Sequence, residues 1–337
     1  MDSDPRLKLR DADRDRLKIM FLAKHARSDG ALHPVDGSHA SYHHELRRVL
    51  ERLLPNLKVG DCFEDLLADT HHDYLFTLLN RGGFKNSEML AATICVWRKK
   101  PHLGASPILR GVGDDKHLMK LCARARGVAT PDSEIYRRGG GHRAAPDFPW
   151  ARLVVKPNAS SASWGVKMLD TWEEALDHMD WLFGEGGHDV LVERYFDGIE
   201  LAVPVIGGAD GRPVYLPVMK YTSNDDDRIR TYEEKRGLKP TSEGFRPIND
   251  PELSRLVIGE VEKMIPEIWP FDFGRFEFKV NPATMQAMFL EVNMSCNLSS
   301  KKTLSLSWQS LGLAHDELVE TILTHSLMRQ NLIAGRA

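Results

Sequence analysis

The sequence predicts an α/β protein of two or three domains. Its 337 residues exceed one ordinary domain, since domains commonly contain about 100–200 residues. In the first part of the chain, short apolar runs alternate with amphipathic helical patterns, which favours a parallel sheet flanked by helices. The second half contains successive strand patterns separated by turns, and the last two of these patterns favour an antiparallel pair.

Composition and charge exclude several classes of protein. Hydrophobic residues make up 42% of the chain and charged residues 28%, which is typical of a globular core with a solvated surface. A net charge of -3 argues against a nucleic-acid-binding surface spread over the chain, although it leaves room for a local basic pocket. No apolar run approaches the ~20 residues that span a bilayer, and the charged N-terminus lacks the apolar core of a signal peptide.

The cysteines indicate a reducing compartment. Cys62, Cys95, Cys122 and Cys296 lie far apart and form no C-x-x-C pair, which favours free thiols over a disulfide framework or a zinc site. We therefore expect a soluble, cytoplasmic protein without nucleic-acid or membrane partners.

The first elements follow from the spacing of apolar residues. Residues 1–18 are dense in charge and are expected to fray. Ser41 is the expected N-cap of the first amphipathic helix. The predicted order is strand 18–25, helix 41–54, strand 73–80 and, after a glycine-led turn, helix 82–100.

The middle of the chain predicts a helix, a loop and a strand-rich segment. Gly127 is expected to close the first helix, and Thr171 to cap the second. The predicted order is helix 113–127, Gly/Pro-rich loop 137–150, strand 152–157, small-residue loop 158–163, strand 164–169, helix 171–183, and strands 188–196, 199–208 and 213–221.

The last part begins with a long charged segment, 221–249, which has no apolar period. Loops longer than about 12–15 residues are commonly functional or disordered, so this segment is a candidate lid. Beyond it, the predicted order is helix 250–265, strands 273–280 and 287–293, and helix 315–328.

Carboxylates mark the last two strands. Alternation places Glu277 on one face of its strand together with Arg275 and Lys279, and it groups Phe289 with Glu291 and Asn293 on the other strand. If the strands pair, Glu277, Glu291 and Asn293 converge and offer the hard oxygen ligands that suit Mg²⁺. The alternative is a set of charged residues on the solvent face of a hairpin.

Two lysines and a small-residue loop suggest an anion site. Lys156 ends a strand and precedes the loop 158–163, whose backbone N–H groups can approach an anion closely, and Lys116 opens a helix upstream. The chain contains neither a Walker A motif nor G-x-G-x-x-G after a strand, so a serine-rich surface hairpin is the alternative. Glu193 and Glu200 lie at strand ends, where they can accept hydrogen bonds from a nucleotide or remain solvated turn carboxylates.

Six segments occur in an order that resembles the ATP-grasp enzymes, in particular the D-alanine–D-alanine ligase branch. The resemblance covers roughly residues 75–330 and is carried by DDKHLMKLCARARGVATP, LVVKPNASSASWGVKML, VLVERYFDGIELAV, YEEKR, GRFEFKV and FLEVNMSCNL. It implies an ATP-grasp fold of α/β (α+β) class in three domains: a Rossmann-like parallel sheet in 1–112, a small lid in 113–197 and a larger antiparallel-sheet domain in 198–337. ATP would lie between the last two domains.

The resemblance also implies residue roles. Glu277, Glu291 and Asn293 would hold Mg²⁺, most simply as two ions, with Mn²⁺ as an expected substitute. Arg275, Lys235 and Ser163 would act in catalysis, Arg275 by stabilising the tetrahedral intermediate and Lys235 by reaching the γ-phosphate. The residues expected to bind ATP are Lys116, Lys156, Ser160, Ser161, Ser163, Gly165, Glu193, Arg194, Tyr195, Phe196, Glu200 and Lys235.

The implied activity is that of an ATP-dependent carboxylate–amine ligase. It would form a dipeptide or related amide through an acyl phosphate, from small-molecule substrates, and relatives suggest a homodimer. The alternatives are a ligase that forms an ester or extends a peptide, and a regulatory protein that binds ATP without chemistry.

The chain departs from the family where substrates would bind. The Gly-, Glu- and Ser-containing motif expected after the first strand is missing, and Asn-x-x-Pro-Gly is replaced by Asn293-Met-Ser-Cys-Asn297. Arg236 replaces a tyrosine. We therefore expect the same reaction on different substrates, contacted by Arg275, Arg236, Asn297, Ser299 and Lys302. Among the histidines, His39 and His43 have helical zinc-ligand spacing without H-E-x-x-H, whereas His43, His44 and Glu45 are placed to bind the donor amino acid.

Overall fold

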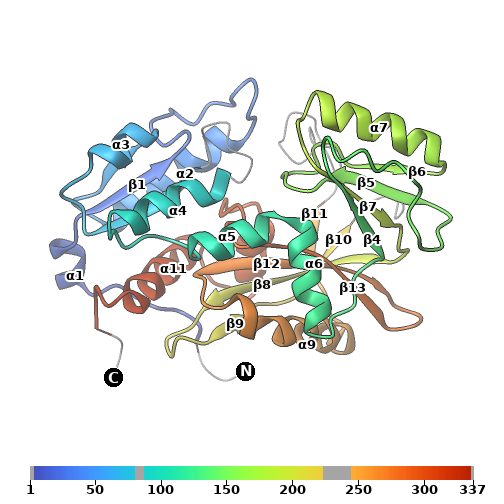
Figure 1. The fold of residues 1–337 in the computed structure, drawn as a ribbon. Helices are drawn as coiled ribbons and strands as arrows, with labels where there is room; N and C mark the ends of the chain where they lie inside the picture. The colour runs from blue at the N-terminus through green and yellow to red at the C-terminus, as the bar shows by residue number, and fades with distance from the viewer. Residues whose placement is uncertain (1–3, 80–86, 223–243, 335–337) are drawn as a thin grey trace.

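The computed structural model describes residues 4–79, 87–222 and 244–334. Within these residues the strands form three sheets, each built from its own stretch of the chain (Figure 1). None of the described helices is both long enough and apolar enough to cross a membrane.

The first sheet is parallel, as predicted. Its order is β2 (Lys58–Gly60), β1 (Ile19–Ala23) and β3 (Tyr74–Leu78). All five residues of β1 and of β3 are buried, because helices cover both faces of the sheet. These helices are α2 (His39–Leu53), α3 (Phe63–Ala68) and α4 (Ser87–Trp97).

Two predictions for this part of the chain are wrong. Ser41 does not cap α2: Ser38 is the N-cap residue, and the Ser41 hydroxyl donates to the Gly30 carbonyl oxygen at 2.7 Å. The described residues 4–18 are anchored rather than frayed, because Leu7, Leu9 and Leu17 are buried. They also include α1 (Asp11–Arg16).

The second sheet is antiparallel and carries one helix on its face. Its order is β4 (Ser133–Tyr136), β7 (Val190–Arg194), β5 (Leu153–Pro157) and β6 (Lys167–Leu169), so the predicted strand 164–169 is shortened. The covering helix is α7 (Trp172–Gly184). Thr171 caps it as predicted, in a capping box with Glu174.

The third sheet is also antiparallel. Its order is β11 (Gly244–Pro247), β10 (Met219–Thr222), β8 (Ile199–Gly207), β12 (Phe273–Asn281) and β13 (Gln286–Asn293), and β9 (Pro213–Tyr215) pairs with β8. The predicted strand 213–221 is divided in two at Pro217, whose nitrogen has no hydrogen to donate to a ladder. β11 lies inside the predicted loop 221–249, and residues 223–243 of that loop lie outside the described part.

Helices connect and cover these sheets. The predicted helix 113–127 is found as α6 (Lys116–Ala125), which starts after residue 113 because the Asp115 side chain accepts from Leu118 N and caps it. The helix before it, α5 (Pro107–Asp114), was not predicted. Gly127 follows α6 with a positive φ of 70°, as its predicted closing role requires. The remaining described helices are α9 (Pro251–Ile268), α10 (Thr303–Gln309) and α11 (His315–Arg329).

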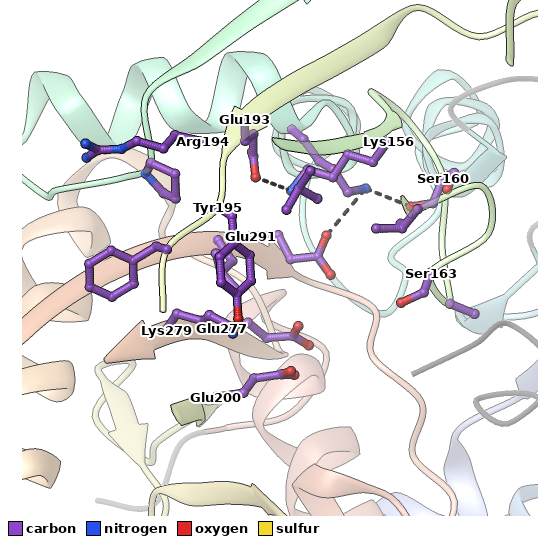
Figure 2. Close-up of a pocket in the computed structure, with 17 residues that line it drawn as sticks. Lys156, Ser160, Ser163, Glu193, Arg194, Tyr195, Glu200, Glu277, Lys279 and Glu291 are labelled. Atoms are coloured by element: carbon purple, nitrogen blue, oxygen red, sulfur yellow. Dashed lines mark hydrogen bonds and ion pairs between the residues drawn. The ribbon is translucent and has the colours of Figure 1, made fainter. Parts of the chain in front are cut away.

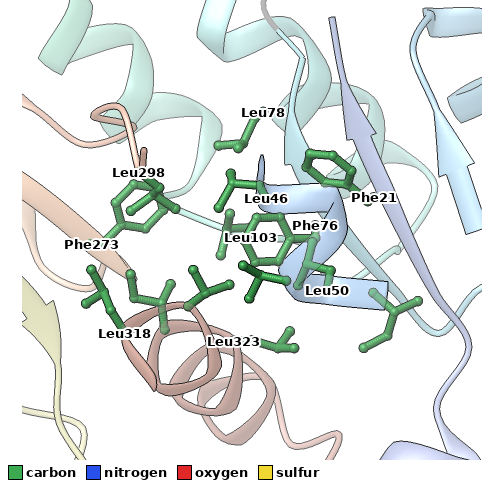
Figure 3. Packing of buried hydrophobic residues seen from close by; sticks show 14 of the residues in the cluster. Phe21, Leu46, Leu50, Phe76, Leu78, Leu103, Phe273, Leu298, Leu318 and Leu323 are labelled. Carbon is green, nitrogen blue, oxygen red and sulfur yellow. The ribbon is translucent and has the colours of Figure 1, made fainter. Parts of the chain in front are cut away.

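The C-terminal helix shares a core with the first sheet. Leu318 and Leu323 of α11 pack in one cluster with Phe21, Leu46 and Phe76 (Figure 3). The last helix of the chain, which follows the third sheet, therefore packs against the N-terminal part that contains the first sheet. The domain boundaries at 112/113 and 197/198 stay a prediction.

Gly207 marks a point where α11 approaches β8 so closely that a side chain has no room. A Cβ on Gly207 would lie 2.0 Å from the Nε2 atom of His325, which is itself buried on α11. Gly207→Ala is therefore expected to lower the free energy of unfolding by about 1–3 kcal/mol, measured by urea denaturation. Gly184→Ala is the control, since a Cβ there meets nothing within 4 Å. Equal stability of the two variants would contradict the close approach.

Candidate functional site

A cleft lies between the second and third sheets and collects most of the predicted site residues (Figure 2). Its walls come from β5, the loop after β5, the end of β7, and strands β8, β12 and β13. Its lining residues are Lys116, Pro131, Val154, Lys156, Ser160, Ala162, Ser163, Val166, Glu193, Arg194, Tyr195, Phe196, Glu200, Glu277, Lys279, Leu290 and Glu291.

Two carboxylates, from neighbouring strands, line the floor of this cleft. Glu277 of β12 is paired directly with Glu291 of β13, and the next pair on the same face is Arg275 with Asn293. The predicted convergence of Glu277 and Glu291 is therefore confirmed. The Asn293 side chain lies beyond the cleft lining, and its Oδ1 accepts from Ser295 N at 3.1 Å.

A β-bulge aims Glu291 at the cleft. The register shifts between the pairs Glu277–Glu291 and Phe278–Phe289, so that Leu290 is the extra residue on β13. Phe289 is consequently buried against Phe278, with ring centroids 5.6 Å apart, whereas Glu291 lies on the opposite, polar face. The predicted shared face of Phe289 and Glu291 is wrong, because simple alternation does not anticipate the inserted residue.

The two predicted lysines lie together above the carboxylates. Lys156 Nζ is 2.7 Å from Glu193 Oε2, and Lys116 Nζ donates to the Ser160 carbonyl oxygen at 2.8 Å. Lys116 Nζ also lies 3.4 Å from Glu291 Oε2. Both lysines are buried, so water screens their positive charges only weakly. Each ammonium group therefore produces a strong positive electrostatic potential at the cleft wall.

The loop after β5 has the strained backbone of a close-approach loop. Ala162 and Ser163 have positive φ values of 57° and 56°, which are rare for residues other than glycine and are often found at binding sites. Gly165 also has a positive φ, and a Cβ there would lie 2.8 Å from Leu182 Cδ2. Ser160 and Ser163 line the cleft, whereas Ser161 and Gly165 shape the loop from outside its lining.

The end of β7 forms a further wall. Arg194, Tyr195 and Phe196 line the cleft next to Glu200 of β8, and their contact with a nucleotide stays a prediction. Sequence reasoning did not assign Lys279, which also lines the cleft and donates to the Tyr195 hydroxyl at 3.2 Å. Its signal was available, since alternation puts it on the face of Glu277.

Arg275 lies two residues before Glu277 on β12, outside the cleft lining. Its guanidinium forms an ion pair with Glu277, and Nη1 donates to Thr303 Oγ1 at 3.3 Å. Burial alone would lower the pKa of Arg275, but the adjacent Glu277 carboxylate raises it above its ordinary value. Arg275 is therefore a fixed positive charge at one end of the site.

Three of the five predicted substrate residues, Asn297, Ser299 and Lys302, lie in the loop between β13 and α10. Asn297 Oδ1 accepts from Ser299 N at 2.8 Å, and Lys302 is the N-cap residue of α10. Ser300 N donates to Glu45 Oε2 at 3.1 Å, which joins this loop to α2 of the first sheet. Their contact with a substrate stays a prediction. Lys235 and Arg236 lie outside the described residues.

The histidines of the first sheet do not combine into a good metal site. Among described residues, the group that converges there is His25, His33 and Asp36, and it includes neither His39 nor His43, the two histidines with helical ligand spacing. Asp36 Oδ2 is already paired with Lys24 at 2.5 Å and with His25 Nε2 at 2.8 Å. The Nδ1 atom of His33 accepts from the backbone N–H groups of residues 35 and 36, so these groups are satisfied without a metal.

The known proteins that this chain resembles include D-alanine–D-alanine ligases and one uncharacterized protein. The family model described as D-ala D-ala ligase C-terminus matches residues 145–324. The uncharacterized protein y4sG of Sinorhizobium fredii is 26% identical over 66% of this chain and 65% of its own length. The D-alanine–D-alanine ligase of Caulobacter vibrioides is 24% identical over 83% of this chain and 86% of its own length.

Solved structures give the same fold. The D-alanine–D-alanine ligase of Bacillus anthracis complexed with ATP has a TM-score of 0.69 at 18% identity, covering 94% of this chain and 99% of that one. The VanG D-Ala:D-Ser ligase of Enterococcus faecalis has a TM-score of 0.70 at 15% identity, covering 93% and 100%. The predicted ATP-grasp fold is confirmed by these likenesses.

Proposed function

We propose, from the premise that this chain belongs to the D-alanine–D-alanine ligase family of ATP-grasp enzymes, that it is an ATP-dependent carboxylate–amine ligase. It would join a carboxylate to an amine as a dipeptide or related amide, through an acyl phosphate, and release ADP and phosphate. One observation carries this proposal: a single cleft brings Lys116 and Lys156 over the paired carboxylates Glu277 and Glu291.

The cleft residues suit a bound nucleotide triphosphate. Lys116 and Lys156 would neutralise phosphate oxygens, and Ser160 and Ser163 would close over them from the strained loop. The backbone of residues 194–196 would meet adenine, and Glu200 the ribose. Phosphoryl transfer depends mainly on positioning and on charge neutralisation, which these groups can supply.

The carboxylate pair fits a divalent cation. Glu277 and Glu291 are direct partners across β12 and β13 and both line the cleft, and Mg²⁺ in such sites takes one or two carboxylates and shares substrate phosphate oxygens. We propose that Asn293 is a further metal ligand. We also propose that the site binds two Mg²⁺ ions and that Mn²⁺ can replace them. Bound there, the metal would neutralise charge on the phosphates. Glu277 would also keep Arg275 oriented through their ion pair.

Arg275 is the proposed donor to the tetrahedral oxyanion, so its removal separates binding from chemistry. Arg275→Ala is expected to keep ATP affinity within about 3-fold and to lower amide formation by about 10²–10³-fold, the cost of losing one oxyanion donor. Arg126→Ala, at an exposed position on the edge of α6, is the control. Calorimetric titration of ATP and a coupled assay of ADP release measure the two effects. Loss of ATP binding in Arg275→Ala would contradict the assignment.

We expect substrates other than two D-alanines. Two of the three departures lie in the loop between β13 and α10 and in the loop after β1, where family substrates would bind, and the third is Arg236. Arg236, Asn297, Ser299 and Lys302 are the proposed contacts, and Lys235 the proposed γ-phosphate contact. We also propose that the chain has the three domains predicted above, that it forms a homodimer and that it is located in the cytoplasm.

A substrate panel tests this function. Pairs of amino acids and other carboxylates with amines are incubated with ATP and Mg²⁺, and phosphate release and product mass are recorded. Hydroxylamine added in place of the amine should trap the activated carboxylate as a hydroxamate. An ester or an extended peptide among the products would favour that alternative. ATP binding without phosphate release across the panel would favour the regulatory alternative.

A further inference from the structure

A fully buried lysine, Lys120, lies behind the cleft and has none of the roles proposed above. It follows Lys116 by one turn of α6, and its side chain has no exposed surface. Its ammonium group meets Thr130 Oγ1 at 2.7 Å, the Phe289 carbonyl oxygen at 3.3 Å and Glu193 Oε1 at 2.9 Å. Two hydrogen bonds, to Thr130 and to Phe289, and one ion pair with Glu193 therefore hold the ammonium in place.

Glu193 joins this buried lysine to the cleft. Its Oε1 faces Lys120, and its Oε2 accepts from Lys156 Nζ at 2.7 Å. Burial alone would raise the pKa of Glu193, but the two lysines lower it, so the carboxylate stays ionised. Two cations and one anion leave one net positive charge in this group.

That net charge faces the cleft at Lys156. Lys156 lines the cleft, whereas Lys120 is covered by α6, β13 and the Glu193 side chain. If Lys120 were neutral, Glu193 and Lys156 would form a neutral pair, and Glu193 would hold the Lys156 ammonium against the wall. The field that attracts phosphate would then fall, because buried charges are weakly screened.

We propose that Lys120 is a positioning residue of the nucleotide site, which neutralises Glu193 so that the charge of Lys156 remains available to a phosphate group. This inference rests on the proposed function, since it requires that the cleft bind a nucleotide. It differs from the roles of Lys116 and Lys156, because Lys120 touches no ligand and acts only through Glu193.

The test compares two ligands that differ only in phosphate. Dissociation constants of ADP and of adenosine are measured by calorimetric titration for the parent, Lys120→Met and Lys120→Gln. Both variants should bind ADP on the order of 10- to 100-fold more weakly, the range for a lost interaction with a charged group. Adenosine affinity should change less than about 3-fold, because no phosphate is present. Lys120→Gln retains an N–H donor for Thr130 Oγ1 and isolates the effect of charge.

A double variant separates charge balance from packing. Lys120→Met with Glu193→Gln removes one charge of each sign and leaves Lys156 unpaired, so its ADP affinity should return to within about 5-fold of the parent. If Lys120→Met does not fold, Lys120→Gln, which keeps a polar group at the buried position, is the single variant with which the double variant is compared. Lys263→Met, at an exposed lysine of α9, is the matched control and should behave as the parent.

Three outcomes would overturn the inference: parent-like ADP affinity in both single variants, equal losses for ADP and adenosine, or a double variant no better than Lys120→Met. Failure of the parent itself to bind ADP would instead reject the proposed function. The two failures are therefore distinguishable.

Discussion

Glu291→Gln is expected to lower ligase turnover by about 10²–10³-fold without unfolding the protein. A metal ion at this position would contribute several kcal/mol to stabilising the transferring phosphoryl group, and about 1.4 kcal/mol corresponds to a factor of ten in rate. The neutral amide is nearly the same size as the carboxylate but is a much poorer ligand for Mg²⁺. Phosphate release over a Mg²⁺ titration, with the substrate pair found in the panel, measures the effect.

A second readout separates metal binding from other roles of Glu291. In the parent, Glu291 Oε2 lies 3.4 Å from Lys116 Nζ, so the substitution also releases part of that lysine's charge. ADP measured in the presence of a chelator should therefore bind Glu291→Gln at least as tightly as it binds the parent. Glu252→Gln, on the exposed first turn of α9, is the control for the same chemical change. Parent-like turnover of Glu291→Gln would mean that the metal assignment is wrong.

The sequence was sufficient to predict which residues form the floor of the cleft, but not the backbone geometry that orients them. Alternation along β12 and β13 placed Glu277 and Glu291 on faces that could converge on the condition that the two strands pair, and the structure supplies that pairing. It could not predict the bulge at Leu290, since an inserted residue depends on how β13 packs against its neighbours. The same bulge explains why Phe289 is buried while Glu291 lines the cleft.

Elements without a strong period were missed for a related reason. The boundary between α5 and α6 depends on Asp115 acting as a cap, and β11 depends on pairing with β10 rather than on its own composition. Lys120 looks like an ordinary polar position of an amphipathic helix, and only the approach of β7 and β13 shows that it is buried beside Glu193. Local patterns thus predicted most elements, whereas long-range pairing determined their ends and the buried charges.

Asp272, the residue before β12, is a buried carboxylate that links segments far apart in the sequence through hydrogen bonds. This side chain has no exposed surface and accepts hydrogen bonds from Gly104 N at 2.5 Å and from Ser326 Oγ at 2.6 Å. Arg329 Nε donates to it at 2.9 Å, and the hydroxyl of Tyr74 on β3 donates to Ser326 Oγ. One carboxylate therefore connects the third sheet, α11 and the segment before α5.

Asp272→Ala is consequently expected to lower the free energy of unfolding by about 3–5 kcal/mol, the usual cost of leaving a buried charge without its partner. The group left behind is Arg329: burial would lower its pKa, but Asp272 raises it, so the arginine stays charged and loses its counter-ion. Asp180→Ala, which removes an exposed ion pair with Arg143, should cost no more than about 1 kcal/mol. Urea denaturation followed by tryptophan fluorescence measures both variants. Since Asp272 lies outside the cleft, Asp272→Ala should keep its nucleotide affinity at low temperature. A loss of stability no larger than that of Asp180→Ala would show that the network does not hold these parts together.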